Sequence, residues 1–336
     1  MPRESPRIYM NRTDKTGGSF KVNKYMPEGR LWNTPANLAA MRSPAALAEA
    51  KREGRILEAR AAVCDSSHNL LVDLGCMTGV IPREEGAVGL REGTVRDIAL
   101  ISRVNKPVCF FITDFSTEGG RPVAVLSRRA VQEKCQREYL ERLIPGDVID
   151  GRVTHFEPFG AFVDIGCGIP SLIPIDTISV SRISHPSDRF RIGEDIRAVV
   201  RGIDCSGRIS LSHKELLGTW KENAERFHVG ETVSGIVRSV ENYGVFIELS
   251  PNLAGLAEPR EGVEVGSQAS VYIKNILEDK MKVKLIIIDT FGKDPQPQPL
   301  EYFCREDHLD RWVYSPDSCS RVIETLFCER PDDIPA

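Results

Sequence analysis

The strongest constraint on the fold of this chain is an internal repeat. The first copy lies at residues 146–212 and contains GDVIDGRVTHFEPFGAFVDIG followed by GEDIRAVVRGIDCSGRISLS. The second copy lies at residues 230–285 and contains GETVSGIVRSVENYGVFIELS followed by VYIKNILEDKMKVKL. Turn glycines recur at matching offsets in the two copies. Two copies of one supersecondary unit predict tandem domains more strongly than either copy alone.

Each copy contains strands in which side chains alternate between an apolar and a polar side. Phe162 shares the polar side of its strand with Asp164, and Phe246 shares the polar side of its strand with Glu248. The residues expected to face inward are Ala161, Val163 and Ile165 in the first copy and Val245, Ile247 and Leu249 in the second. The alternation therefore predicts that each unit carries a phenylalanine on its outer face.

Basic residues follow the same alternation near the end of each copy. Arg208 in the first copy, and Lys282 and Lys284 in the second, are predicted to point outward. An exposed ring can stack on a base, and an exposed cation can pair with phosphate. The pattern therefore predicts that each unit binds single-stranded nucleic acid.

Two further aromatic residues stand three positions before the outward phenylalanines. Phe159 precedes Phe162 across a glycine, and Tyr243 precedes Phe246 in the same way. A glycine lets the backbone turn closely, so both rings of a pair can face one groove. The alternative is that one ring of each pair belongs to the core.

Two of these basic residues, Arg208 and Lys282, also have an acidic residue four positions before them. Asp204 precedes Arg208 around a turn that contains Gly207, and Glu278 precedes Lys282. This spacing would place each carboxylate beside the cation and fix its direction. The alternative is a surface salt bridge of little energetic value.

These segments resemble the S1 RNA-binding domain family. The resemblance rests on G-R-V-x-x-x-x-x-F-G-A-F-V-D-I-G and I-D-x-x-G-R-I-S-L-S. It implies a five-stranded OB-fold barrel whose second and third strands hold single-stranded RNA. It also assigns the Asp204 and Arg208 pair to the RNA site. Many S1 domains have a histidine on the third strand, whereas this chain has Pro174 and Glu258 at the matching places.

A third, degenerate copy precedes the other two, at residues 55–127. Leu71 occupies the place of Phe162 and Phe246, and Val123 occupies the place of Arg208 and Lys282. Because the stacking and phosphate-binding groups are missing, this copy is interpreted as a barrel kept for packing or for docking to a protein.

The predicted fold is mainly β, with three tandem five-stranded OB-fold (S1) barrels joined by short α-helices and with flexible termini. A helix over residues 44–55 is expected to begin after an N-cap at Ser43 and to stop at Gly54. A short helix is also expected near residues 321–328. The predicted division is a basic N-terminal tail and short helix (1–53), a degenerate barrel (54–130), a connecting helix (131–145), an S1 domain (146–214), a second connecting helix (215–229), an S1 domain (230–290), and a Pro-rich linker with an acidic C-terminal tail (291–336).

The resemblance extends further, over roughly residues 54–290, to the short, Gram-positive clostridial-type form of the bacterial ribosomal protein S1 family. It is carried by FGAFVDIG, LSHKELLGTWKENAERF and SGIVRSVENYGVFIELSPNLAGLAEP. The family implies binding of single-stranded mRNA at the small ribosomal subunit during translation initiation, in the cytoplasm. The alternatives are a non-ribosomal RNA-binding regulator or RNA-turnover accessory factor, and a protein-docking scaffold.

Composition and motifs argue against other classes of function. The net charge of −4 over 336 residues gives no general attraction to a polyanion, so RNA binding would depend on local patches. Nine cysteines without a signal peptide or a long apolar run predict a cytosolic protein with reduced thiols. The absence of phosphate-loop, HExxH and CxxC motifs predicts no enzyme activity, no cofactor, no metal, no membrane contact and no small-molecule substrate. His155, His185 and His213 are interpreted as surface residues.

Overall fold

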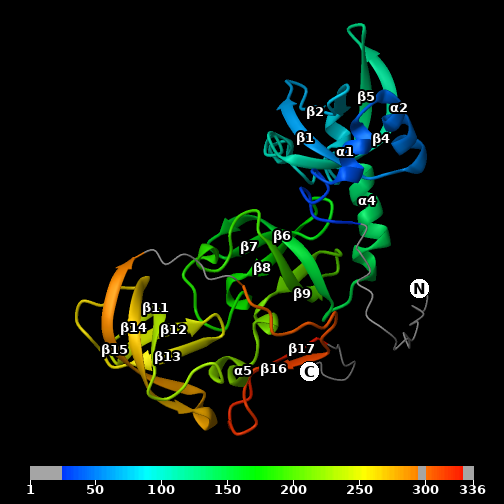
Figure 1. Ribbon diagram of the computed structural model, residues 1–336. Coiled ribbons are helices and arrows are strands. Elements are labelled where there is room, and N and C mark those ends of the chain that lie inside the picture. The colour runs from blue at the N-terminus through cyan, green and yellow to red at the C-terminus, as the bar shows by residue number, and fades with distance from the viewer. Residues whose placement is uncertain (1–24, 294–299, 328–336) are drawn as a thin grey trace, which may run out of the picture.

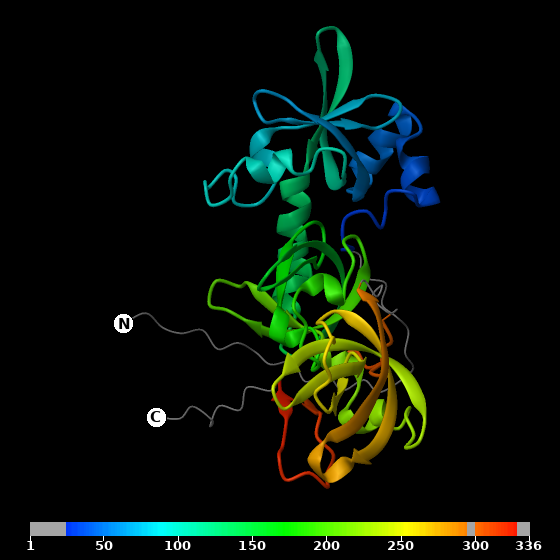
Figure 2. The same ribbon diagram turned by 90° about the vertical axis from the view of Figure 1, so that its left-hand side faces the viewer.

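Three closed β-barrels follow one another along the chain in a computed structural model that describes residues 25–293 and 300–327. Barrel 1 stands apart at one end, and barrels 2 and 3 lie together at the other (Figures 1 and 2). The predicted mainly β fold with three five-stranded barrels is confirmed. Most of the predicted basic tail, the proline-rich linker at 294–299 and the last residues from 328 lie outside the described part.

All three barrels share one strand topology, in which the third and fifth strands pair in parallel and the other pairs are antiparallel. Barrel 1 consists of β1 (Leu57–Cys64), β2 (Leu70–Asp73), β3 (Thr78–Ile81), β4 (Pro107–Glu118) and β5 (Arg121–Ser127). Barrel 2 consists of β6 (Val148–Glu157), β7 (Gly160–Asp164), β8 (Pro170–Pro174), β9 (Asp195–Ile203) and β10 (Ile209–Ser212). Barrel 3 consists of β11 (Thr232–Glu241), β12 (Gly244–Ser250), β13 (Leu253–Ala257), β14 (Ser267–Leu277) and β15 (Lys282–Lys293).

Helices lie before and between the barrels, and one short helix lies within barrel 1, between β3 and β4. Helix α2 (Pro44–Glu53) has the predicted ends, because the Ser43 side chain accepts from the amide of Ala46 and Gly54 adopts a left-handed φ of 59°. Helix α4 (Arg128–Glu138) leads from barrel 1 to barrel 2 (Figure 1). The remaining helices are α1 (Pro35–Met41), α3 (Ile98–Ile101) and α5 (Trp220–Ala224). None of the described helices is long and apolar enough to cross a membrane.

Each barrel has a core built from the inward side of its strands. In barrel 2 the predicted inward residues Ala161, Val163 and Ile165 are almost fully buried, and Phe162 between them is half-buried. Val245 and Ile247 are buried in the same way in barrel 3. The two-residue period therefore determines which side chains form the core.

A buried network of charged groups joins barrel 1 to barrel 2. The carboxylate of Glu28 accepts hydrogen bonds from the Arg128 guanidinium at 2.6 and 3.0 Å. The backbone amide of Glu28 donates to the carboxylate of Asp164 at 2.8 Å. Asp164 was expected to face solvent, but it is only 3% exposed because this junction covers it. The segment that begins at Tyr25 is thus part of the packed structure, although it was predicted to belong to a flexible tail.

The same junction makes stability dependent on pH. The fully buried carboxyl group of Glu58 accepts three backbone N–H groups at one oxygen, and its other oxygen has no partner. Burial, together with the nearby charge of Glu28, raises the pKa of Glu58 from 4.5 to about 7. The folded chain then holds a proton that the unfolded chain has lost, so the free energy of unfolding falls as pH rises from 4.5 to about 7.

We expect Glu58→Gln, which is neutral at every pH, to remove this part of the fall in the free energy of unfolding as pH rises. The measurement is the urea midpoint of both chains at pH 5 and pH 7.5. An equal drop in the two chains would contradict the assignment, because Asp164, whose pKa is also raised, to about 6, would then account for the slope.

A second buried ion-pair network joins barrel 2 to barrel 3. Glu248 on β12 pairs with Arg189 of barrel 2 at 2.9 Å and with Arg238 of its own barrel at 2.9 Å. Like Asp164, Glu248 was expected to face solvent, but it is only 5% exposed. In barrels 2 and 3, the second-strand carboxylate that was expected to face solvent therefore binds a residue from outside its own barrel.

Residues 300–327, named here the C-terminal segment, pack against barrels 2 and 3 instead of forming a tail. The Tyr302 hydroxyl accepts from the amide of Arg197 in β9 at 3.0 Å, and the Tyr314 hydroxyl donates to the carbonyl of Asn252 in barrel 3 at 2.6 Å. The segment contains the two-stranded sheet of β16 (Arg311–Val313) and β17 (Glu324–Leu326). The helix predicted near residues 321–328 is wrong, because β17 occupies its place.

Candidate nucleic-acid interface

Three aromatic rings gather on the outer face of barrel 2. The imidazole of His155 on β6 stacks on the ring of Phe162 on β7, with centroids 4.4 Å apart and planes 5° apart. Phe159 lies edge-on to Phe162 at 6.3 Å and is 55% exposed. These three rings, named here the barrel 2 aromatic cluster, form an apolar platform that faces solvent.

The β6–β7 hairpin positions the cluster. Its strands pair His155 with Phe162 and Glu157 with Gly160, and Phe159 lies in the two-residue turn. A Cβ at Gly160 would lie 2.3 Å from the carbonyl oxygen of Ile173, so only glycine allows β8 to approach this closely. The predicted pair of rings on either side of a glycine is therefore brought together.

A cation lies on the same face of barrel 2. Phe162 pairs with Leu172 on β8, and Leu172 pairs with Ser210 on β10. Two strand spacings, roughly 10 Å, therefore separate Phe162 from Ser210. Arg208 stands two residues before Ser210, and its side chain is 84% exposed. A base stacked on Phe162 and a phosphate on Arg208 thus lie within reach of one short RNA segment.

The Arg208 guanidinium is held in place by Asp204. Its Nε donates to Asp204 Oδ2 at 2.8 Å, as the four-residue spacing suggested. The other oxygen of Asp204 accepts from Ser206 and from the amide of Arg208. The hydrogen bonds from Ser206 and Arg208 lower the pKa of Asp204, so the carboxylate keeps its charge. The other nitrogens of the guanidinium form no hydrogen bond or ion pair with the part of the chain that the structure describes, and the side chain is 84% exposed.

Barrel 3 repeats the arrangement with different groups. Tyr243 is 68% exposed and lies edge-on to Phe246 at 6.1 Å. Phe246 is level with Leu256, and Leu256 with the exposed Lys284. Ser239 pairs with Phe246 where barrel 2 has His155, so barrel 3 has no third ring at this place.

Glu278 and Lys282 do not form the predicted pair. Both side chains are exposed, and no ion pair joins them in the structure described for residues 25–293. A short 3-10 turn, Glu278–Lys280, and the left-handed Met281 separate Glu278 from β15. Lys282 and Lys284 therefore stand on one strand face as two cations without an ion-pair partner among residues 25–293 and 300–327.

Barrel 1 has an aliphatic row in place of the aromatic and basic groups. Leu71 pairs with Val63 and Val80, and Val80 with Val125. Val123, at the place of Arg208, is buried. The strand register thus agrees with the sequence alignment of the degenerate copy.

One of the three histidines differs from the sequence-based interpretation as a surface residue. His155 is exposed, as predicted, and its ring also belongs to the barrel 2 aromatic cluster. His213 is fully buried, with Nδ1 2.9 Å from the carbonyl oxygen of Ile178, and burial lowers its pKa to about 4. The location of His155 depends on a bulge between Val153 and His155, which shifts the hairpin register by one residue.

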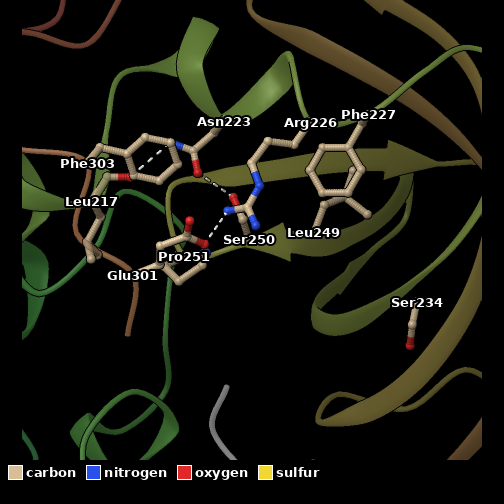
Figure 3. A pocket seen from close by; sticks show the side chains of 10 residues that line it. All are labelled: Leu217, Asn223, Arg226, Phe227, Ser234, Leu249, Ser250, Pro251, Glu301 and Phe303. Carbon is tan, nitrogen blue, oxygen red and sulfur yellow. Dashed lines mark hydrogen bonds and ion pairs between the residues drawn. The ribbon is translucent and has the colours of Figure 1, made fainter. Parts of the chain in front are cut away.

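A pocket lies away from these faces, where α5 and the C-terminal segment meet barrel 3 (Figure 3). Its volume is about 310 Å³, and it shares no residue with the aromatic clusters. Arg226 pairs with Glu301 at 2.8 Å, and the Asn223 side chain accepts from the Ser250 hydroxyl at 2.7 Å. Because its polar groups bind one another, we interpret it as a joint between elements. In the described residues, no group of three or more His, Cys, Asp and Glu side chains is arranged to hold a metal ion.

Comparison with known proteins places barrel 2 in a family. Residues 142–214 match the model of the S1 RNA binding domain. The small ribosomal subunit protein bS1 of Staphylococcus aureus (strain COL) is 33% identical over 214 residues, which is 55% of this chain and 54% of that protein. The bS1 homolog of Bacillus subtilis (strain 168) is 30% identical over 229 residues, covering 59% of this chain and 60% of the homolog.

The chain thus spans little more than half the length of these relatives. Among solved structures, a multidomain protein with nucleic acid binding domains from Streptococcus pneumoniae TIGR4 aligns over 70% of this chain and 74% of that chain, with 15% identity and a TM-score of 0.24, which is too low to bear on function. The domain match, the barrel topology and the bS1 relatives agree. Barrel 2 is therefore an S1 RNA binding domain, in a chain that is similar to bacterial bS1 proteins.

Proposed function

We propose that the chain binds single-stranded RNA, including mRNA, through barrels 2 and 3, and that it does so at the small ribosomal subunit during translation initiation, without catalysis. The observation that carries this proposal is the pairing of exposed aromatic rings with exposed cations on one face of each barrel. The names of the bS1 relatives support the ribosomal part. Association with the ribosome would place the chain in the cytoplasm.

The proposed site divides into rings and charges. Rings stack on bases of any sequence, because every base has a π-face, and cations hold the backbone. The proposed contact residues are Phe159, Phe162, Asp204 and Arg208 in barrel 2 and Tyr243, Phe246, Lys282 and Lys284 in barrel 3, with His155 added from the structure. Glu278 receives no support as a member, because its carboxylate is unpaired and would repel phosphate. Two modest sites on one chain strengthen each other through effective concentration.

The test compares a labelled single strand of about 20 nucleotides, long enough for more than one OB-fold site, with the matching duplex. We expect the full chain to bind the single strand more tightly, because stacked bases in a duplex cannot reach the rings. The chain should also sediment with small ribosomal subunits at moderate salt, near one copy per particle. Equal binding to both RNAs would contradict the site, and binding without co-sedimentation would indicate a non-ribosomal RNA-binding factor.

A further inference from the structure

The turn that precedes β4 places two cations of barrel 1, Arg103 and Lys106, at the edge of barrel 2. Arg103 donates to the Glu28 carboxylate at 3.3 Å, and Arg152 on β6 donates to the Glu28 carbonyl at 3.3 Å. A Cβ on Gly29 would lie 3.2 Å from Pro107, the first residue of β4, and 2.5 Å from the Arg152 guanidinium. The start of β4 and the middle of β6 therefore lie on either side of one short backbone segment.

The charges of this turn reach the barrel 2 aromatic cluster. His155 lies three residues beyond Arg152 on β6 and is exposed. Partial burial lowers its pKa, and the positive charges of Arg103 and Lys106 lower it further, against the opposing effect of Glu157. Since the His155 ring stacks on Phe162, the charges that act on His155 also act on the platform on which a base would lie.

The turn is also fixed in shape. Asn105 adopts a φ of 65°, a left-handed conformation that asparagine tolerates, and its amide donates to the carbonyl of Ala61 at 2.7 Å. The Asn105 side chain accepts from Arg60 at 2.6 Å, and the amide of Ala61 donates to the carbonyl of Lys106 at 3.0 Å. A cation on a turn held at several points loses little freedom when it binds a ligand.

Arg103 and Lys106 differ in what they do in the folded chain. Arg103 already pairs with Glu28, and that pair helps to hold the junction. Lys106 is exposed, and no ion pair to it is found in the described ranges 25–293 and 300–327. Its ammonium group is free for an anion.

We propose that barrel 1, although its own stacking face is degenerate, completes the RNA site of barrel 2, with Lys106 holding a phosphate of the strand whose base stacks on Phe162. This proposal rests on the proposed function and makes it more specific. The ligand is the phosphodiester backbone of single-stranded RNA, and the strand crosses the junction between barrels 1 and 2. Barrel 1 then acts as an electrostatic extension of its neighbour.

The test measures the salt dependence of single-stranded RNA binding by the full chain and by the variants Lys106→Ala, Lys106→Glu, Arg208→Ala and Arg121→Ala. For single strands, each lost phosphate contact reduces the slope of log K against log salt by about 0.7. We expect this reduction in Lys106→Ala and Arg208→Ala, and a larger loss of affinity in Lys106→Glu. Arg121→Ala is the matched control, because Arg121 begins β5 at the far end of the hairpin that projects away from barrel 2 (Figure 1).

The variants separate this proposal from the proposed function. A wild-type slope in Lys106→Ala, with a reduced slope in Arg208→Ala, would overturn the role of barrel 1 and leave RNA binding by barrel 2 intact. An equal effect in Lys106→Ala and Arg121→Ala would also overturn it, because the loss would then reflect net charge alone. If the unmodified chain binds no RNA, the proposed function itself fails. Because Lys106 is exposed and unpaired, we expect its variants to have the same urea midpoint as the unmodified chain. Equal midpoints would show that these substitutions leave the fold unchanged.

Discussion

Replacing Phe162 and Phe246 together with alanine is expected to lower the affinity of the full chain for single-stranded RNA by roughly thirty-fold or more, since stacking contributes about 1–3 kcal/mol per base. Each ring is half-buried and lies edge-on to a second ring that faces solvent. In barrel 2 the loss also removes the surface on which His155 stacks, so two rings are displaced by one substitution. The measurement is a binding titration at fixed salt.

Leu71→Ala is the matched control for this prediction. Leu71 occupies the same strand position in barrel 1, and its neighbours there are aliphatic. We expect that variant to bind RNA as tightly as the unmodified chain. Phe162→Leu keeps apolar contact with the barrel and should still weaken binding, which separates lost stacking from a disturbed fold. Unchanged affinity in the double alanine variant would exclude these rings from the site.

Replacing Glu248 with alanine should be the most destabilising single change at the junction of barrels 2 and 3. The substitution leaves Arg189, whose side chain is only 5% exposed, without a carboxylate, and Arg238 keeps only its longer 3.4 Å pair with Asp188. Breaking a buried pair in this way costs about 3–5 kcal/mol, because an uncompensated charge remains buried. We expect the free energy of unfolding in urea to fall by that amount.

Asp73→Ala is the matched control for Glu248→Ala. Asp73 has the equivalent position on β2 of barrel 1, where it is exposed, and within the described residues its carboxylate accepts only from the nearby Gly75 amide. A change of less than about 1 kcal/mol is expected there, as for other surface substitutions. Similar losses in both variants would show that the strand position matters for the barrel itself and not for the junction.

Local patterns explain what the sequence could predict. The two-residue period separates Val163 from Phe162 without knowledge of the rest of the fold, because it depends on the backbone alone. The ends of α2 were predictable for the same reason, since Ser43 and Gly54 satisfy backbone groups within one turn of themselves. The Asp204 and Arg208 contact spans a single tight turn and is equally local.

Long-range packing explains what it could not predict. Asp164 and Glu248 have the alternation of surface residues, and only the docking of other segments buries them. His155 reaches Phe162 through a bulge, which no alternation rule anticipates. Helix α1 is short, and the C-terminal segment has little periodicity, so their positions follow from the surfaces that they meet. The proposed role of Lys106 likewise depends on how two domains meet.

The C-terminal segment has a consequence for the order of events during synthesis. Barrels 2 and 3 each have their own core, so each can close as soon as its strands have left the ribosome. The ties through Tyr302 and Tyr314 can form only after both barrels have been made, because residues 300–327 follow them. A nascent chain that has just completed β15 therefore holds its two proposed RNA faces less firmly relative to each other than the full chain does. Their mutual orientation is one of the last properties that the growing polypeptide acquires.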